Sequence, residues 1–259
     1  MSSSSAQKSA KTGRGMSAAL FVSDLHLCPT RPKIARQFLA FLNGPGREAQ
    51  ALYILGDLFE YWAGDDDLSE PFNAEIVGAL KNLTEHGTGL FFLRGNRDFL
   101  AGEGFARASG AVLLEEPHLF TLFGKPTLLM HGDTLCSDDL SYQEFREEVR
   151  SQAWRDAFLA QPLSLRKKQI EALRKRSEQA KQVKPASIMD VNAGAVANLL
   201  QRYRFPLLIH GHTHRQAHHE SNIDGQPCER WVLGDWFERG SYLACDEEGC
   251  RAAPWPPAA

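Results

Sequence analysis

Side chains that bind divalent metals follow five short apolar runs of the chain, at residues 18–22, 51–55, 89–93, 127–130 and 205–209. These side chains are Asp24, His26, Asp57, Asn96, His131, His212 and His214. In the D-x-H and H-x-H pairs, alternate residues of an extended segment point the same way, so both can reach one ion. A mixed set of Asp, Asn and His suits Mn²⁺, Fe²⁺ or Zn²⁺ better than Ca²⁺. The pattern therefore predicts a transition-metal site.

The apolar runs are continuous and bounded by turn residues, which is typical of buried strands. Stretches between them, such as 32–43 and 70–86, have the apolar spacing of helices, and Pro32 suits the first turn of one. The chain is therefore predicted to be of the α/β class. Sites in open α/β sheets form beyond the carboxyl ends of the strands, so we expect the metal-binding residues to converge. One His or one Gly-Asp after a strand is usually structural, but recurrence after five runs favours a site.

Composition sets limits on the class of protein. The 259 residues are 43% apolar and 24% charged, with a net charge of −3, so any anion-binding role needs a local basic surface. The chain is long enough for one large or two small domains. The five cysteines are odd in number, scattered and without a C-x-x-C pair. They argue against a disulfide framework or a zinc ribbon, and for a reducing cytoplasm.

The expected domain organisation is one folded unit with an insertion. Residues 1–16 are rich in Ser and Lys and lack the apolar core of a secretory signal, so we expect a disordered tail. Residues 17–250 form the domain, with a helical, basic insertion at about 139–203, and the Pro-rich residues 251–259 are expected to be frayed. No apolar run reaches the roughly 20 residues that span a bilayer.

The motifs D-x-H, G-D, G-N-x-D, H-G-D and G-H-x-H, in this order over about residues 18–243, resemble the calcineurin-like metallophosphoesterase superfamily. The resemblance implies a two-layered β-sandwich flanked by helices, with a binuclear metal centre. It implies one metal held by Asp24, His26, Asp57 and His214. It implies a second held by Asn96, His131 and His212, with Asp57 bridging the two. We expect His210 to be structural, and His218 and His219 to be surface or strand residues.

Arg97 departs from the general pattern of the superfamily. The stretch GNRDFL has Arg97 where the superfamily has a His that is thought to help the leaving group. An Arg is always charged and cannot act as a neutral acid, but it can bind a phosphate through two hydrogen bonds. We therefore expect Arg97 to recognise phosphate.

Three further stretches, GNRDFL, HGDTLCSDDLSYQEFR and SIMDVN, resemble the UDP-2,3-diacylglucosamine pyrophosphatase family of lipid A biosynthesis. That family cleaves its substrate to UMP and 2,3-diacylglucosamine 1-phosphate, through a metal-activated water that attacks the α-phosphorus. The resemblance implies two Mn²⁺ ions per chain. It implies catalytic roles for Asp57, Asn96, Arg97 and His212. It implies substrate contacts by Asn96, Arg97, Asp139, Tyr142, Ser177, Lys181, Lys184 and His212.

Residues 163–184 carry eight Lys and Arg side chains against only Glu171 and Glu178. Such a run is usually a solvated helix face. Nucleic-acid binding is disfavoured because net charge is negative and no aromatic residues interleave with the basic ones. The family resemblance favours a lid over an anionic lipid substrate, on a monomer bound peripherally to the cytoplasmic face of the inner membrane. The apolar residues of this region either line an acyl-chain groove or pack against the core: Leu159, Leu163, Leu165, Ile170 and Leu173.

Other functions stay open on the sequence alone. One is a different phosphoesterase of the superfamily, such as a nuclease or a dinucleoside polyphosphate hydrolase, against which Arg97 and the family-specific stretches argue. A second is a scaffold without activity, like the retromer subunit that shares this fold, but that alternative predicts lost ligands and all seven positions are filled. A third is a nucleic-acid-binding module built on the basic insertion.

Overall fold

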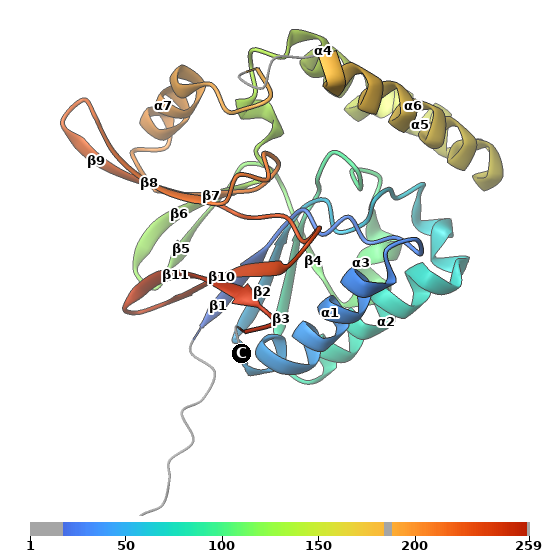
Figure 1. Ribbon diagram of the computed structural model, residues 1–259, viewed down its shortest axis with the longest axis horizontal. Coiled ribbons are helices and arrows are strands. Elements are labelled where there is room, and N and C mark those ends of the chain that lie inside the picture. Colours follow the sequence, from blue (N-terminus) through green and yellow to red (C-terminus); the bar gives the residue numbers. More distant parts are fainter. Residues whose placement is uncertain (1–17, 184–187, 258–259) are drawn as a thin grey trace, which may run out of the picture.

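The computed structural model describes residues 18–183 and 188–257, and these form two β-sheets with helices on both outer sides (Figure 1). The first sheet has six strands in the order β11-β10-β1-β2-β3-β4. Strands β1 to β4 are parallel, and the hairpin of β10 and β11 extends the sheet antiparallel beside β1. Their bounds are Ala19–Val22 (β1), Ala51–Leu55 (β2), Gly89–Leu93 (β3), Val112–Leu114 (β4), Gly240–Asp246 (β10) and Gly249–Trp255 (β11).

The second sheet has five strands in the order β5-β6-β7-β9-β8. Strands β6, β7 and β9 are parallel, while β5 and β8 are antiparallel at the two edges. Their bounds are His118–Leu122 (β5), Lys125–Met130 (β6), Leu207–His210 (β7), Ala217–Ile223 (β8) and Gln226–Val232 (β9). All five apolar runs of the sequence are therefore strands, and each sheet contains parallel strands that end on the same side.

Helices cover the outer face of each sheet. On the first sheet these are α1 (Pro32–Phe41), α2 (Pro71–Glu85) and α3 (Glu103–Ser109), and on the second it is α7 (Ala193–Arg202). Short helical turns lie at Leu42–Gly46, Asp65–Ser69 and Asp133–Leu135. In α1, Pro32 is at the first turn and the buried side chains Ile34, Phe38 and Phe41 recur at helical spacing, so one stripe of the helix faces the sheet.

Three apolar clusters hold these layers together. The middle one, which lies between the sheets, joins Phe21 and Tyr53 of the first sheet to Leu129 and Ile209 of the second. A second cluster joins the first sheet to α1, α2 and α3, and a third joins the second sheet to α7. The expected two-layered sandwich flanked by helices is confirmed.

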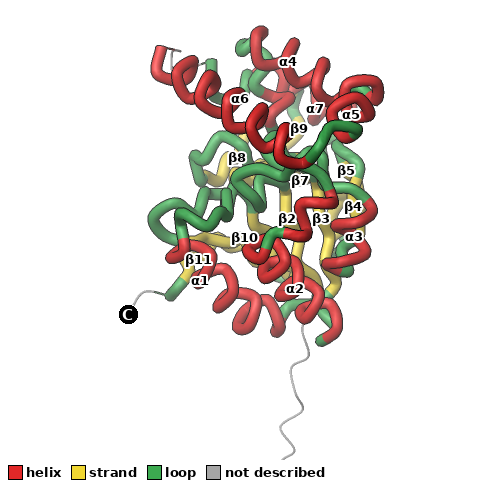
Figure 2. Tube along the Cα trace, turned by 90° about the vertical axis from the view of Figure 1, so that its right-hand side faces the viewer, coloured by secondary structure: helices red, strands yellow, loops and turns green. Residues whose placement is uncertain are grey.

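The predicted insertion divides into two parts. Helices α4 (Leu140–Arg150), α5 (Gln152–Leu159) and α6 (Leu163–Val183) stand over the ends of the strands (Figure 2). Helix α7 instead packs into the fold, because Val196 and Leu200 are buried against Leu128, Met130 and Leu208 of the second sheet. Among the described residues, no helix is long and apolar enough to cross a bilayer.

Helix α6 is pinned to the body of the protein by its basic residues. Arg166 is 2% exposed and donates to the carbonyl of Ala63 and to the carboxylate of Asp66. Lys167 pairs with Asp67 at 2.7 Å. Further along the helix, Arg174 Nη2 lies 2.9 Å from the carboxylate of Glu60. These three basic side chains therefore anchor the helix and do not form the solvated face that is usual for such a run.

The C-terminal expectation was wrong over most of its length. Residues 251–259 were expected to be frayed, whereas β11 continues to Trp255 at the edge of the first sheet. Pro254 is tolerated there because an edge strand does not need every backbone N–H. The Trp255 side chain donates to the carbonyl of Gln37 at 3.0 Å and its ring lies 5.9 Å from that of Phe41, which ties the strand to α1.

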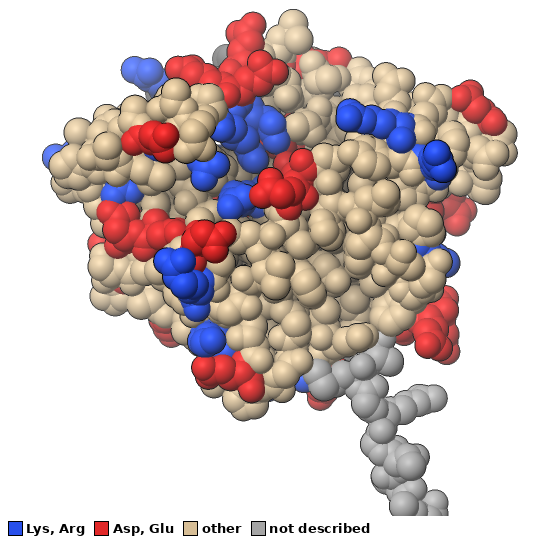
Figure 3. All heavy atoms as spheres, turned by 180° about the vertical axis from the view of Figure 1, so that it is seen from behind, with Lys and Arg blue, Asp and Glu red and all other residues tan. Residues whose placement is uncertain are grey.

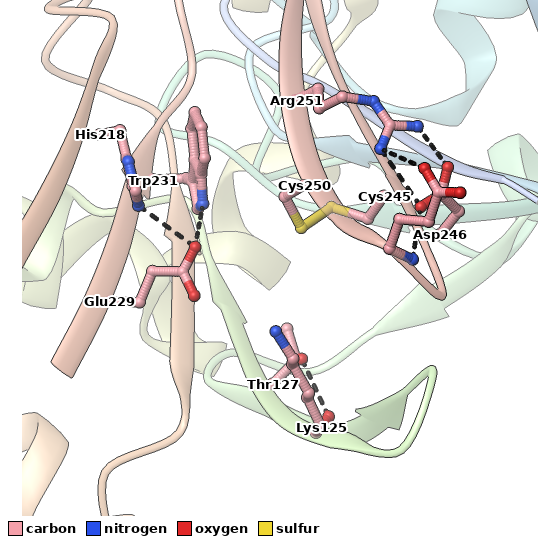
Figure 4. Close-up of a disulfide and its surroundings, with 10 residues drawn as sticks. Lys125, Thr127, His218, Glu229, Trp231, Cys245, Asp246, Cys250 and Arg251 are labelled. Atoms are coloured by element: carbon pink, nitrogen blue, oxygen red, sulfur yellow. Dashed lines mark hydrogen bonds and ion pairs between the residues drawn. A yellow bond between two sulfur atoms is a disulfide. The ribbon is translucent and has the colours of Figure 1, made fainter. Parts of the chain in front are cut away.

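The cysteine pattern argued against a disulfide framework, and the structure contains one disulfide. Cys245 and Cys250 form a disulfide across the hairpin of β10 and β11 (Figure 4). The two residues are directly opposite each other in the register of the hairpin, which brings their side chains together. The other cysteines, Cys28, Cys136 and Cys228, are free.

Candidate metal centre

The seven predicted ligands meet in space beyond the carboxyl ends of the parallel strands. Five of them have a backbone in the left-handed region: Asp24 (φ 56°), His26 (49°), Asp57 (54°), His212 (70°) and His214 (60°). Residues other than glycine rarely adopt this conformation, and it is concentrated at functional sites where the surrounding structure enforces it. The turns after the strands are therefore shaped to aim these side chains, at a cost in backbone strain.

Close backbone packing allows this convergence. A Cβ atom at Gly95 would overlap Asp57 Oδ1, and one at Gly211 would overlap Ser23 Oγ and Asp24 Oδ2. Only glycine allows the strand-end loops to approach so closely. Close packing thus explains the glycine of the G-N motif, Gly95, and that of the G-H motif, Gly211.

One cluster of ligands comprises Asp24, His26 and His214. His214 Nε2 lies 3.4 Å from Asp24 Oδ1 and 3.3 Å from His26 Nε2. The potential ligand atoms of the three residues all lie within 4.8 Å of one another. His214 Nδ1 lies 3.3 Å from Asp235 Oδ2, so Asp235 orients the ring and leaves Nε2 facing the cluster.

A second cluster comprises Asn96, His131 and His212. Asn96 Oδ1 lies 3.0 Å from His131 Nε2 and 2.9 Å from His212 Nδ1, and the two histidine nitrogens are 3.2 Å apart. His131 Nδ1 lies 2.9 Å from the carbonyl oxygen of Leu55, to which it donates, and this fixes Nε2 as the atom that faces the cluster.

Asp57 lies between the two clusters. Its Oδ2 is 3.7 Å from His26 Nε2 and its Oδ1 is 3.8 Å from His131 Nε2. It is almost fully buried, as are Asp24 and His131. One carboxylate with an oxygen towards each cluster is the arrangement that a bridging ligand requires.

The protonation of the site reflects dense, buried charge. Burial, together with the neighbouring Asp98 and Asp24 carboxylates, raises the pKa of Asp57 to about 7. Burial alone would lower the pKa of His131, but the Asp57 and Asp24 carboxylates outweigh it and raise that pKa to about 9. Burial would likewise lower the pKa of His214, yet Asp235 and Asp24 raise it to about 9. Protons on His131 and His214 balance the negative charge in this site.

These residues fit a divalent cation. Asp24 Oδ1 is buried and, within the described part of the chain, it accepts no hydrogen bond. A buried carboxylate oxygen without a donor is costly unless a cation lies close to it. The set of imidazole, carboxylate and amide donors suits a first-row divalent metal. A cation there would replace the protons that balance the charge.

The predicted substrate contacts lie around a cavity of about 610 Å³ above the two clusters. Helices α4 to α6 form its roof, and Asn96, Arg97, Asp139, Tyr142, Ser177 and His212 are among its lining residues. Tyr142 was expected to contact the substrate, but its hydroxyl donates to Asp133 Oδ2 at 2.7 Å. The side chains of Lys181 and Lys184 lie outside the described part of the chain.

Much of the cavity wall is apolar. Ile170 and Leu173 line it, whereas Leu159 and Leu165 are 38% and 44% exposed. The two uses left open for the insertion's apolar residues therefore coexist, because Ile170 also packs against the core. Other apolar lining residues are Phe99, Leu100, Phe145, Val149, Trp154 and Phe158.

The remaining histidines behave as expected. His210 is fully buried on β7, and its Nε2 lies 3.1 Å from Arg230 Nη1. His218 and His219 lie on the edge strand β8. Figure 4 shows that His218 and Trp231 both contact the Glu229 carboxylate.

Several supporting residues were missed from the sequence. Asp98 accepts the backbone N–H groups of Gly95 and Leu58 at 2.8 and 2.7 Å, and so fixes two ligand loops. Asp133 and Asp235 hold other parts of the site. The signal for these three was present, because each is the Asp of a motif-like stretch, GNRD, HGD or GDW. Arg146 ends the quoted stretch HGDTLCSDDLSYQEFR, whereas Arg150 had no such signal.

Comparison with known proteins agrees with this geometry. The family model described as calcineurin-like phosphoesterase matches residues 18–216. A UDP-2,3-diacylglucosamine hydrolase of Aromatoleum aromaticum is 57% identical over 232 residues, which are 90% of this chain and 94% of the relative. Proteins of the same name from Escherichia coli O127:H6 and Escherichia fergusonii are each 48% identical over 226 residues, 87% of this chain and 94% of theirs. The chain therefore belongs to the calcineurin-like phosphoesterase family and, within it, to the UDP-2,3-diacylglucosamine hydrolases.

Proposed function

We propose that the protein hydrolyses the pyrophosphate bond of UDP-2,3-diacylglucosamine, giving UMP and 2,3-diacylglucosamine 1-phosphate, as a step of lipid A biosynthesis. One observation carries the proposal: two clusters of side chains that can bind metal, with a carboxylate between them, form the floor of a cavity whose wall is in large part apolar. Phosphate chemistry at the floor and space for acyl chains under the roof match a substrate that has both. The names of the relatives point to the same reaction.

The proposed centre holds two divalent ions, for which Mn²⁺ is our candidate. Asp24, His26 and His214 would hold one ion and Asn96, His131 and His212 would hold the other, with Asp57 shared between them. When bound, such ions lower the pKa of a coordinated water from 15.7 to about 7 and neutralise phosphate charge. Every side chain needed to bind them is within a few ångströms of its partners.

The chain's own groups then orient the phosphates. The backbone N–H of Arg97 donates to Asp57 Oδ1 at 2.8 Å, which leaves the guanidinium to reach into the cavity that it lines. A guanidinium can stabilise the charge that builds on the phosphoryl oxygens as water attacks the α-phosphorus. Asn96 and His212 line the same floor and would contact these oxygens. No side-chain nucleophile is required.

Apolar contacts hold the lipid half of the substrate. The side chains of Phe145, Trp154, Phe158 and Leu173 line the cavity beneath α4 to α6. Acyl chains would bury against them, at about 0.8 kcal/mol for each CH₂ group. Asp139, Ser177, Lys181 and Lys184 are the other proposed polar contacts to the substrate.

We also propose that the monomer acts at the cytoplasmic surface of the inner membrane. Exposed apolar side chains gather on the roof helices, with Leu140 70% and Phe145 39% exposed. An amphipathic surface of this kind supports peripheral binding. Nucleic acid is disfavoured, since Figure 3 shows basic and acidic groups interspersed on the face seen from behind, and Arg166, Lys167 and Arg174 of α6 are in ion pairs.

The test is release of UMP from UDP-2,3-diacylglucosamine, with Mn²⁺ and with EDTA, beside hydrolysis of a chromogenic phosphodiester. Mn²⁺-dependent release of UMP from the lipid alone is the expected result. Hydrolysis of the chromogenic ester alone would be consistent with a phosphoesterase but would exclude the lipid as its substrate. If neither is hydrolysed by protein that contains metal, the proposed reaction is wrong.

A further inference from the structure

Three side chains of α4 point towards the floor of the cavity. Tyr142, Arg146 and Arg150 are spaced four residues apart, so they lie on one face of the helix. All three line the cavity. Their polar atoms, however, form hydrogen bonds with other residues of the protein beneath the helix. This face of α4 therefore has structural partners on the floor.

Arg150 contacts the loop that carries Asn96, one of the proposed metal ligands. Its Nη2 donates to the carbonyl oxygen of Gly95 at 3.0 Å. Gly95 directly precedes Asn96 in the chain. Arg150 thus connects α4 to the backbone from which the Asn96 side chain projects.

Arg146 is linked to the proposed ligand His131 through the carboxylate of Glu116. Its Nη2 lies 3.2 Å from Glu116 Oε2, and Glu116 Oε1 accepts the backbone N–H of His131 at 2.8 Å. Its Nε donates to Asp133 Oδ2 at 2.7 Å. Asp133 and Glu116 are both buried or nearly so, with side-chain exposures of 0% and 10%. Arg146 thus bridges two buried carboxylates on either side of the His131 backbone.

Tyr142 contacts the proposed ligand His212. Its ring lies 5.8 Å from that of His212 with 29° between the planes. Its hydroxyl donates to the same oxygen of Asp133 that Arg146 contacts. The ring is therefore held against His212 by a hydrogen bond at its far end.

The other ligand cluster has supports from different segments. His214 is oriented by Asp235, and Ser23 Oγ donates to Asp24 Oδ2 at 2.5 Å. Phe237 packs on both His26 and His214, with ring centroids 5.3 Å from each. These supports come from the turn after β1 and from the segment between β9 and β10. The supports of the two halves thus come from different segments, and one backbone hydrogen bond joins the halves, from the His212 N–H to Asp24 Oδ2 at 2.9 Å.

We infer that α4 positions one half of the metal centre, the half formed by Asn96, His131 and His212, and sets its affinity for metal separately from the other half. This inference rests on the proposed function, because it takes these side chains as metal ligands. Supports behind metal ligands typically contribute 10- to 100-fold in metal affinity. The first helix of the cavity roof is thereby also part of the metal site.

The experiment measures Mn²⁺ affinity in the full chain without substrate, by the electron paramagnetic resonance signal of free Mn²⁺. Two backgrounds isolate the halves: His214→Ala leaves the half that α4 supports, and His131→Ala leaves the other. Adding Arg146→Met should weaken binding by about 10- to 100-fold in the first background and leave it unchanged in the second. Asp235→Asn is the matched control and should give the reverse pattern.

Equal losses in both backgrounds, or none in either, would overturn the inference. If a single-half background binds no Mn²⁺, the two variants are compared in the otherwise unchanged chain, where they must weaken different steps of the titration. Weakening of the same step would again contradict it. Lys167→Met, which breaks an anchor of α6 remote from the ligands, should change neither step.

Folding is checked by thermal unfolding of each metal-free variant. If Arg146→Met does not fold, Tyr142→Phe and Arg146→Lys replace it. Lys keeps the charge but cannot bridge two carboxylates, so it should give intermediate affinity, and an affinity equal to that of Arg would count against the inference. Failure of the proposed function is separate: the unchanged chain would then bind no Mn²⁺ or release no UMP. Turnover with two Mn²⁺ steps and no effect of Arg146 would overturn only the role of α4.

Discussion

The backbone N–H of Arg97 donates a 2.8 Å hydrogen bond to Oδ1 of Asp57, the carboxylate between the two ligand clusters. A phosphate-binding side chain and a metal-bridging side chain are thus joined through the main chain. The bond survives any substitution at position 97 except proline, so the two functions can be separated by mutation.

Arg97→Ala should therefore lower turnover while leaving metal content unchanged. The guanidinium lines the cavity, and losing one such donor to a developing phosphoryl charge costs about 10²- to 10³-fold in rate. Mn²⁺ content by elemental analysis and kcat/KM for UMP release are measured together. Arg97→Lys should recover part of the rate, because it restores charge without the two-bond geometry. Loss of Mn²⁺ from Arg97→Ala would contradict the separation of roles.

Asp57→Asn should abolish both full metal binding and turnover. Asn keeps the shape of the side chain but removes the charge and one of the two acceptor oxygens that face His26 and His131. We expect at most one of the proposed ions to remain, and activity to fall to the background of the assay. Circular dichroism serves as the control for folding. Retention of both ions with activity would show that Asp57 does not bridge.

Metal removal should destabilise the folded protein. Asp24 Oδ1 is buried and, within the described residues, accepts no hydrogen bond. A bound divalent ion would add to the positive charge that His214 Nε2 supplies from 3.4 Å. Mn²⁺ at 100 times its dissociation constant should add about 2.7 kcal/mol to the free energy of unfolding for each site that it fills. Differential scanning calorimetry with EDTA and then with excess Mn²⁺ measures this. Asp24→Asn should unfold at a temperature that depends less on Mn²⁺, and an unaltered dependence would remove Asp24 from the ligand set.

The residues of the site could be predicted from the sequence because local patterns carry them. Asp57 follows a buried apolar strand, and parallel strands of one sheet end on the same side, so topology predicts convergence within each sheet. The meeting of the two sheets at one site depends on how they pack, because His131 and His212 follow strands of the second sheet. Arg146 lies at the end of the stretch HGDTLCSDDLSYQEFR, but its partners could not be inferred from that stretch. A charged residue on a helix face looks the same whether it is solvated or bridges two buried carboxylates, because its partners Glu116 and Asp133 are distant in the sequence.

The C-terminal region was predicted wrongly for a similar reason. Pro254 suggested a tail without structure, but its strand lies at the edge of the sheet, where a missing N–H is tolerated. Cys245 and Cys250 were judged from their odd total and wide scatter. Their pairing depends on the register of a hairpin, and a count of cysteines carries no information on register.

Breaking the anchor of α6 should loosen the roof of the cavity without affecting the metals. Arg166 is 2% exposed, donates to the carbonyl of Ala63 and pairs with Asp66. Arg166→Met leaves that buried carbonyl without its donor, which costs about 1–3 kcal/mol. Thermal unfolding should shift down by several degrees, and limited proteolysis should cut faster between α5 and α6. KM for the lipid substrate should rise while Mn²⁺ content stays constant, since the ligands lie on other segments.

Lys168→Met, at an exposed position of the same helix, is the matched control and should leave both the unfolding temperature and the rate of proteolysis unchanged. If Arg166→Met unfolds and is cut like the unchanged protein, α6 is held by its apolar contacts, and the ion pairs at its start are incidental.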